Sequence, residues 1–267
     1  VAAPMAGGPS SNELARAVAS TGALGFLGGG NKTAKRVAED YRSVAASGDV
    51  GVNLFVPDAA NTAVDVAKSQ HGRTEKLAAF REELLPFAQR LGVELPTVEQ
   101  AGADVSDDWE AKLEAAVEWP IVSFTFGLPG PDVFQRLHES DTQVGVTVTS
   151  AAEARNAANH GADFLVVQGP EAGGHRSVHD PLGTPETLEL PELLDAVNAV
   201  VDIPFVAAGG IMTPEDVHKV RSHGASAAAV GTALLLTDEA GSNALHRYML
   251  RTDRSGITQL TRVFSGR

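Results

Sequence analysis

The residues best suited to chemistry lie in one stretch, residues 166–175, with the sequence VVQGPEAGGH. A short apolar run at residues 164–167 predicts a buried strand that ends at Gln168 and opens into a glycine-rich loop. Polar groups at the carboxyl end of a buried strand are typical of active sites in α/β barrels and doubly wound sheets. The pair Gly173-Gly174 lets a ligand approach the backbone, because neither residue has a Cβ. His175 is then placed to act as a general base near neutral pH, although loops also carry many histidines without a role.

Two further glycine-containing pairs, Gly209-Gly210 and Gly231-Thr232, follow the last two predicted strands. Barrels frequently bind a phosphate group at this position, through backbone N–H groups and a short helix N-terminus. The hydroxyl of Thr232 could add a donor, and the side-chain amide of Gln168 suits the polar edge of a heterocycle. The combination predicts a phosphorylated cofactor across the top of a barrel, for which FMN is the natural candidate.

Other polar residues give weaker signals. Asn53 interrupts an apolar strand, where it could satisfy backbone groups or contact a ligand. His175 and His179 are four residues apart, but in a loop, so helical metal-ligand spacing does not apply and no metal site is predicted. Ser123 and Thr125 have no histidine or acid at a spacing that would indicate a serine hydrolase. We interpret the remaining histidines as surface residues: His71, His138, His160, His179, His218, His223 and His246.

Composition limits the class of protein. The chain has 267 residues, 43% of them hydrophobic, which suits one large globular domain or two small ones. A net charge of −13 argues against nucleic-acid binding, and the absence of cysteine excludes disulfides and thiolate chemistry. No apolar run is long enough to span a bilayer, and no signal sequence opens the chain, so we expect a cytoplasmic protein without a membrane role. Because the chain starts inside a strand pattern and stops without a closing element, we also expect both termini to be trimmed.

The elements that must position these residues alternate along the chain. Short apolar strands are predicted at residues 1–5, 23–27, 50–56, 120–126, 143–148, 164–167, 203–208 and 227–230. Helices are predicted between most of them, at residues 12–19, 33–46, 109–118, 132–140, 151–160, 191–200, 213–223 and 242–250. Buried strands alternating with helices indicate a parallel sheet. Eight such units favour a closed (β/α)8 TIM barrel over an open sheet, and the early glycines, Gly7-Gly8 and Gly28 to Gly30, lack the spacing of a dinucleotide fingerprint.

Residues 57–108 break this alternation. They contain a predicted helix at residues 74–91 and an acidic segment at residues 94–108. We interpret them as a helical insertion after the third strand that could shelter one side of the site, because they are too few to build a core of their own. The acidic groups of residues 94–118 are interpreted as solvated faces. The expected organisation is a single domain over residues 1–267.

Six motifs, spread over nearly the whole chain, resemble those of the nitronate monooxygenase family, formerly called 2-nitropropane dioxygenases. They are APMAG at residues 3–7, GVNLF at 51–55, SFTFGLP at 123–129, QGPEAGGH at 168–175, AAGGI at 207–211 and VGT at 230–232. The EAGGH motif is specific for this group of FMN-dependent barrels. Flavin-dependent enoyl-ACP reductases and NADH:quinone reductases look similar.

The resemblance implies a role for each motif. His175 would be the catalytic base or would orient the substrate beside the flavin. FMN would be bound by Ala3, Pro4, Met5, Asn53, Gln168, Gly173, Gly174, Gly209, Gly210, Ala229, Val230, Gly231 and Thr232, the last four holding its phosphate. The reaction would oxidise an alkyl nitronate, such as propionate 3-nitronate, with O2, through a nitronate radical and superoxide, to a carbonyl compound and nitrite. A monomer or homodimer is expected, with no nucleic-acid partner.

Departures from the family pattern keep other functions open. Thr125 stands where many members have a histidine, Ser177 replaces a glycine, and Ala229 replaces a common glutamine. The family also normally continues past Arg267. The alternatives are an NAD(P)H-dependent quinone or enoyl-ACP reductase of the same flavin barrel group, and a non-catalytic flavin-binding protein.

Overall fold

The computed structural model of the chain describes residues 1–57, 63–102, 107–251 and 260–261. The chain divides into two compact units, one formed by Val1–Val56 with Asp108–Arg267 and the other by Pro57–Asp107. The single-domain organisation stays a prediction.

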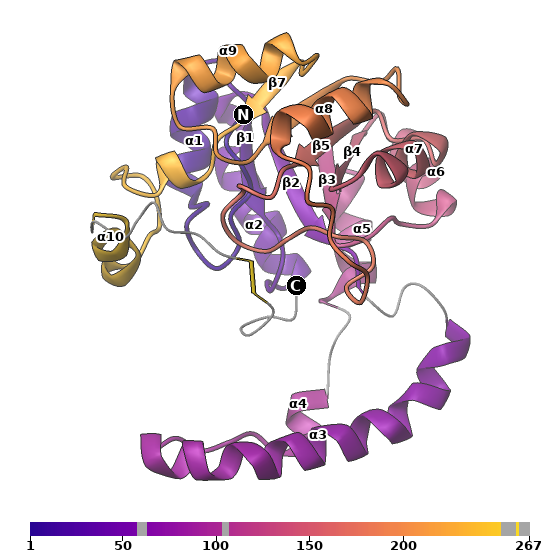
Figure 1. Cartoon of the computed structure of the whole chain (residues 1–267), viewed down its shortest axis with the longest axis vertical. Helices are drawn as coiled ribbons and strands as arrows, with labels where there is room; N and C mark the ends of the chain where they lie inside the picture. The colour runs from indigo at the N-terminus through magenta and orange to yellow at the C-terminus, as the bar shows by residue number, and fades with distance from the viewer. Residues whose placement is uncertain (58–62, 103–106, 252–259, 262–267) are drawn as a thin grey trace. The chain divides into compact units, whose positions relative to one another are not determined.

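The first unit is built on one parallel sheet whose seven strands stand in sequence order (Figure 1). The strands are β1 (Gly25–Gly28), β2 (Val50–Phe55), β3 (Ile121–Thr125), β4 (Gln143–Val148), β5 (Phe164–Gln168), β6 (Phe205–Ala208) and β7 (Ala227–Ala229). Every neighbouring pair is parallel, so each strand must be reached by a crossover connection, and helices form most of these crossovers.

The N-terminal segment joins the two edges of this sheet. Ala2 forms a parallel bridge with Val230, next to the end of β7. The amide of Ala2 also donates to the carbonyl oxygen of Leu24, just before β1, at 3.0 Å. The ring is thereby closed, and the predicted (β/α)8 barrel is confirmed.

The strand predicted at residues 1–5, which precedes β1, is shorter than expected. Residues 1–5 form a single bridge, where the sequence predicts a five-residue strand. Pro4 has no N–H group to continue a ladder, and the amide of Met5 donates to the Oγ of Ser10 at 2.7 Å as the chain turns away.

Helices surround the sheet, and most begin where local sequence signals place them. They are α1 (Asn12–Ser20), α2 (Ala34–Val44), α5 (Trp109–Ala116), α6 (Pro131–His138), α7 (Ala151–Asn159), α8 (Leu190–Asn198), α9 (Pro214–Ser222) and α10 (Ala244–Leu250), with short 3-10 turns η1 (Ala45–Ser47) and η3 (Thr232–Leu234). The side chains of Ser11, Thr33, Ser150 and Thr213 accept the N-capping hydrogen bonds of α1, α2, α7 and α9. At α9, Thr213 and Asp216 form a reciprocal capping box.

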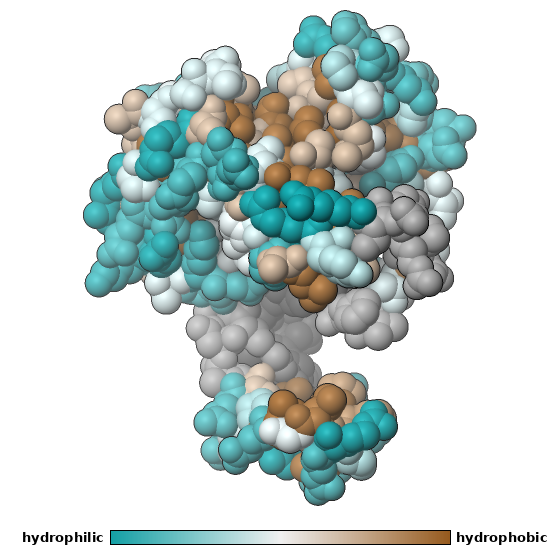
Figure 2. All heavy atoms as spheres, turned by 90° about the vertical axis from the view of Figure 1, so that its left-hand side faces the viewer, coloured by the Kyte–Doolittle hydropathy of each residue, from teal (hydrophilic) through white to brown (hydrophobic). Residues whose placement is uncertain are grey.

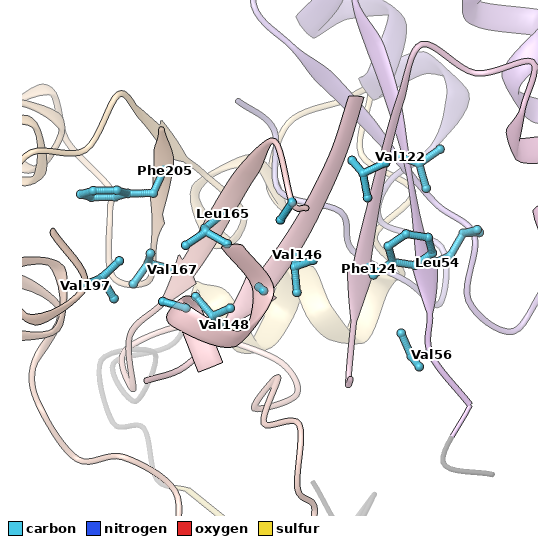
Figure 3. Packing of buried hydrophobic residues seen from close by; sticks show 14 of the residues in the cluster. Leu54, Val56, Val122, Phe124, Val146, Val148, Leu165, Val167, Val197 and Phe205 are labelled. Carbon is cyan, nitrogen blue, oxygen red and sulfur yellow. The ribbon is translucent and has the colours of Figure 1, made fainter. Parts of the chain in front are cut away.

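The main core lies between the strands and the helices. Successive side chains on a strand point to opposite faces, so alternate residues of each strand join this layer. Figure 3 shows part of it, including Leu54, Phe124, Val146, Leu165 and Phe205, all of which are buried. Helix residues such as Leu113, Leu137 and Leu193 complete the same cluster.

The other face of the strands fills the barrel. Here large side chains pack over glycines. A Cβ on Gly145 would lie 2.2 Å from the ring of Phe164, and one on Gly51 would lie 2.5 Å from the ring of Phe26. These glycines therefore make room for two phenylalanine rings inside the barrel.

The second unit contains the long helix α3 (Ala63–Leu91) and the short α4 (Val98–Gly102). Helix α3 begins eleven residues before the predicted start at Thr74 and runs through Gly72, which lowers helix propensity by about 1 kcal/mol without ending the helix. Figure 2 shows brown, apolar residues on the surface of this unit. Its exposed large apolar side chains include Phe80, Phe87, Leu91 and Val93. No helix in the described part of the chain is both long and apolar enough to cross a membrane.

Candidate active site

A stripe of polar side chains crosses the inside of the barrel near the carboxyl ends of β2, β3 and β4. The register pairs Asn53 with Ser123, and the amide nitrogen Nδ2 of Asn53 donates to Ser123 Oγ and Thr125 Oγ1, both at 2.9 Å. Thr125 Oγ1 lies 3.2 Å from Thr147 Oγ1 on the next strand. All four residues are buried. The amide orientation of Asn53 is fixed, because Nδ2 also donates to the carbonyl oxygen of Ser123, which can only accept.

Gln168, at the end of β5, holds the loop that follows it. Its Nε2 donates to the carbonyl oxygen of His175 at 3.0 Å, and its Oε1 accepts from the amide of Ser177 at 2.8 Å. Both polar ends of the side chain therefore bond to the loop backbone on either side of Arg176. The predicted contact of this amide with a heterocycle stays a prediction.

Arg176 is buried directly after His175, with 5% of its surface exposed. Its Nη1 donates to the carbonyl oxygen of Gln168, and its Nε has no hydrogen-bond partner among the described residues. Burial lowers the pKa of its guanidinium, and the carboxylates of Glu153, Glu171 and Glu186 act in the opposite direction. Through its hydrogen bond to Gln168, Arg176 links the loop to the end of β5.

His179 anchors the same loop to the neighbouring strand and helix. Its Nε2 lies 2.9 Å from the carbonyl oxygen of Thr147 on β4, which requires the ring N–H at Nε2. Its backbone amide donates to Glu153 Oε1 on α7 at 2.9 Å. Glu153 Oε2 in turn accepts from the hydroxyl of Thr149. The interpretation of His179 as a surface residue is therefore wrong: the side chain is half-buried, and its spacing in sequence gave no sign of the β4 carbonyl.

His175 itself is exposed on this loop. Its ring centroid lies 5.6 Å from that of Phe126, at an interplanar angle of 64°. Phe126 follows the last residue of β3, so the contact joins the β5 loop to the carboxyl end of β3.

The predicted glycines lie against the other predicted segments. A Cβ on Gly173 would lie 3.0 Å from Thr232 Oγ1, which brings the β5 loop beside the end of β7. One on Gly231 would lie 3.4 Å from the Cβ of Ala3 and 3.7 Å from the sulfur of Met5. Val230 bonds to the amide of Ala3, Ala229 ends β7, and Pro4 lies between Ala3 and Met5.

The glycine pairs also adopt backbone conformations that favour glycine. Gly174, Gly209 and Gly210 have φ values of 86°, 125° and 65°. A Cβ on Gly209 would lie 3.1 Å from the amide nitrogen of Ala172, so β6 ends against the β5 loop. The ends of β5, β6 and β7 and the N-terminal segment are thus close together.

The remaining histidines do not join this group. His138 pairs with Asp163 at 3.0 Å and His223 with Asp195 at 2.8 Å. His160 and His218 each bond through Nδ1 to a carbonyl of their own helix, and His246 is exposed. The side chain of His71 lies outside the described residues. Among the described residues there is also no group of three histidine or acidic side chains that could hold a metal ion.

The donors at the strand ends fit an anionic, phosphorylated group. No hydrogen bond in the described part of the chain uses the backbone N–H of Gly173, Gly210, Gly231 or Thr232. Amide groups in such a cluster, next to glycines that permit close approach, are typical of phosphate binding. The 3-10 turn η3 begins at Thr232, directly after Gly231.

Fold and site together define a class: a (β/α)8 barrel in which, among the described residues, the unpaired backbone donors and His175 gather at the carboxyl ends of the strands, where barrel enzymes have their active sites. The chain belongs to the nitronate monooxygenase family, whose model matches residues 1–267, and it is an oxidoreductase of that family.

Individual relatives agree. The chain is 31% identical over 273 residues to a probable nitronate monooxygenase of Staphylococcus haemolyticus, covering 97% of this chain and 71% of the relative. A second, from Staphylococcus saprophyticus, is 31% identical over 269 residues, with the same coverage. The crystal structure of nitroalkane oxidase from Streptomyces ansochromogenes matches 100% of this chain and 74% of its own, with 37% identity and a TM-score of 0.87. FabK from Thermotoga maritima, at 22% identity over 93% of this chain and 62% of its own and a TM-score of 0.66, shares the fold.

Proposed function

We propose that this chain binds FMN at the carboxyl ends of its strands and oxidises alkyl nitronates, such as propionate 3-nitronate, with O2. The observation that carries the proposal is the cluster of backbone N–H groups from β5, β6 and β7 beside the loop of His175. Membership of the nitronate monooxygenase family and the likeness to a nitroalkane oxidase support the reaction class.

Residues from five segments would hold the cofactor. The amides of Gly210, Gly231 and Thr232 would bind the phosphate, and Gly173 would leave room for close approach. Ala3 and Met5 lie beside Gly231. Asn53 has its amide nitrogen committed to Ser123 and Thr125, so a contact with the flavin would use Oδ1. When bound, FMN supplies the centre that takes electrons from the nitronate and returns them to O2.

The overall reaction balances with two nitronates for each O2, giving two carbonyl compounds and two nitrite ions. A nitronate is already deprotonated at carbon, so the protein need not remove that proton. His175 then orients the substrate through a hydrogen bond from its ring to a nitro oxygen. For a neutral nitroalkane, the same imidazole would act as the base.

The first prediction concerns His175→Asn. Asparagine keeps a polar side chain without an imidazole, so we expect the variant to retain FMN, because the proposed cofactor donors are backbone groups. We expect nitronate oxidation to fall by about 100-fold, because a substrate displaced by about 1 Å can lose that much of its rate. Nitrite release and the flavin spectrum of the purified variant measure the two effects.

The matched control is His218→Asn, on the exposed face of α9, where the one hydrogen bond of the ring to a described residue is to the carbonyl oxygen of Pro214 in its own helix. That variant should turn over like the wild type. Unchanged nitrite release by His175→Asn would remove His175 from the mechanism.

A further inference from the structure

Phe126 adopts an unusual backbone conformation directly after β3. Its φ is 74°, in the left-handed region, which residues with bulky side chains rarely occupy. Such conformations persist only where surrounding contacts hold them, and they cluster at ligand sites. The chain has therefore turned this ring away from the path that the strand would give it.

The turned ring enters an aromatic group at the ends of three strands. The Phe126 centroid lies 4.7 Å from that of Phe55, at the end of β2, and 5.6 Å from that of His175. Phe55 and Phe126 are half-buried, so part of each ring remains accessible. A Cβ on Gly30, which follows β1, would lie 2.1 Å from the Phe55 ring, so glycine is required there for the ring to sit where it does.

We propose that Phe126 and Phe55 form an apolar subsite that receives the hydrocarbon substituent of the nitronate, and that Phe126 is a specificity-determining residue. The inference rests on the proposed function, because it takes His175 as the group that contacts the nitro oxygens. The substituent is bonded to the carbon that carries the nitro group. A substrate held by His175 therefore places its substituent within reach of the ring that contacts His175.

Such a subsite should raise kcat/KM as the hydrocarbon substituent of the nitronate becomes longer. Each methylene that leaves water for an apolar surface is worth about fourfold in kcat/KM. We expect wild-type kcat/KM for butyl-1-nitronate to exceed that for ethylnitronate by about 16-fold, because two methylenes then reach the rings. Removing one ring removes much of that gain.

The test is the ratio of these two kcat/KM values in a set of variants. In Phe126→Ala the ratio should fall to about two or less, and in Phe55→Ala it should fall less far. Phe126→Leu keeps an apolar side chain and should stay within about twofold of the wild-type ratio. If Phe126 merely held His175 in place, its removal would lower kcat/KM for both substrates equally and leave the ratio unchanged.

Leu245→Ala is the matched control, since it removes an apolar side chain that is 65% exposed on α10. Its ratio should equal that of the wild type. A wild-type ratio in an active Phe126→Ala variant overturns the inference; if that variant does not fold, a wild-type ratio in Phe55→Ala does so. A wild-type protein that oxidises no nitronate overturns the proposed function instead.

Discussion

His175 lies on a loop whose backbone is fixed by side chains that are not expected to react. Gln168 bonds to the backbone on both sides of Arg176, and Arg176 returns a hydrogen bond to the carbonyl oxygen of Gln168. A histidine that orients a substrate must itself be held in place, because small displacements reduce the rate steeply. The position of His175 therefore depends on the amide of Gln168.

A second prediction follows for Gln168→Met, which keeps the length of the side chain and removes both hydrogen-bonding groups. We expect faster hydrogen exchange at the amide of Ser177, which loses its acceptor. We also expect about a tenfold loss of kcat for nitronate oxidation, corresponding to about 1.4 kcal/mol.

The control for this variant is Gln135→Met on α6, where the side-chain amide has one hydrogen bond to a described residue, exposed Glu139, at 2.9 Å. It should leave both measurements unchanged. Wild-type exchange at Ser177 together with wild-type kcat in Gln168→Met would show that the amide does not position the loop.

The residue-level features of the site were only partly predictable from the sequence. Glycine runs and a histidine after a buried strand point to a site because their chemistry is local. The partners of Gln168, the burial of Arg176 and the contact of His179 with the Thr147 carbonyl depend on tertiary packing. Each of these residues is polar, and the sequence around it does not show whether its side chain bonds to a buried protein group or to water.

At the scale of elements, local signals were more reliable. The caps at Ser11, Thr33, Ser150 and Thr213 form with neighbours three residues away, so the sequence contains the whole interaction. The strand of residues 1–5 was overestimated because an apolar pattern does not reveal how many ladder bonds a proline permits. Helix α3 was underestimated, since Gly72 reads as a break.

Asp40 shows how one buried carboxylate joins two helices. It lies on α2, 3% exposed, and accepts from Asn12 of α1 at 3.1 Å, from Lys32 at 2.9 Å and from Arg36 at 3.0 Å. Burial alone would raise its pKa, but the hydrogen bonds from Lys32, Asn12 and Arg36 outweigh burial and hold the pKa below its ordinary value.

The third prediction is that Asp40→Asn lowers the free energy of unfolding at pH 7 by about 1–3 kcal/mol. Because the folded-state pKa is depressed, the contribution of Asp40 is fully present above the unfolded-state pKa, about 4, and is lost as the pH falls through the folded value. The difference between the wild type and the variant should therefore shrink in acid. Urea titrations at pH 7 and at pH values below 4 measure it, and a difference that is the same at every pH would contradict the role of the charge.

At the scale of the whole molecule, barrel closure is what brings the site together. The N-terminal segment joins β1 to the residue after β7, and this places Ala3 and Met5 against Gly231. Segments that are more than 200 residues apart in sequence thus meet at one site. The barrel could be predicted from the count and alternation of strands, since both are properties of the whole chain.

The measurement that tests the proposed function most directly is anaerobic reduction of the purified protein, monitored through its long-wavelength flavin absorbance. One sample receives propionate 3-nitronate and another receives NADH or NADPH. We predict that the protein carries FMN, that the nitronate alone removes this absorbance, and that admitting O2 restores it with release of nitrite. Loss of absorbance with a pyridine nucleotide alone would contradict the proposal and indicate a reductase. A protein that takes up no FMN would contradict it altogether.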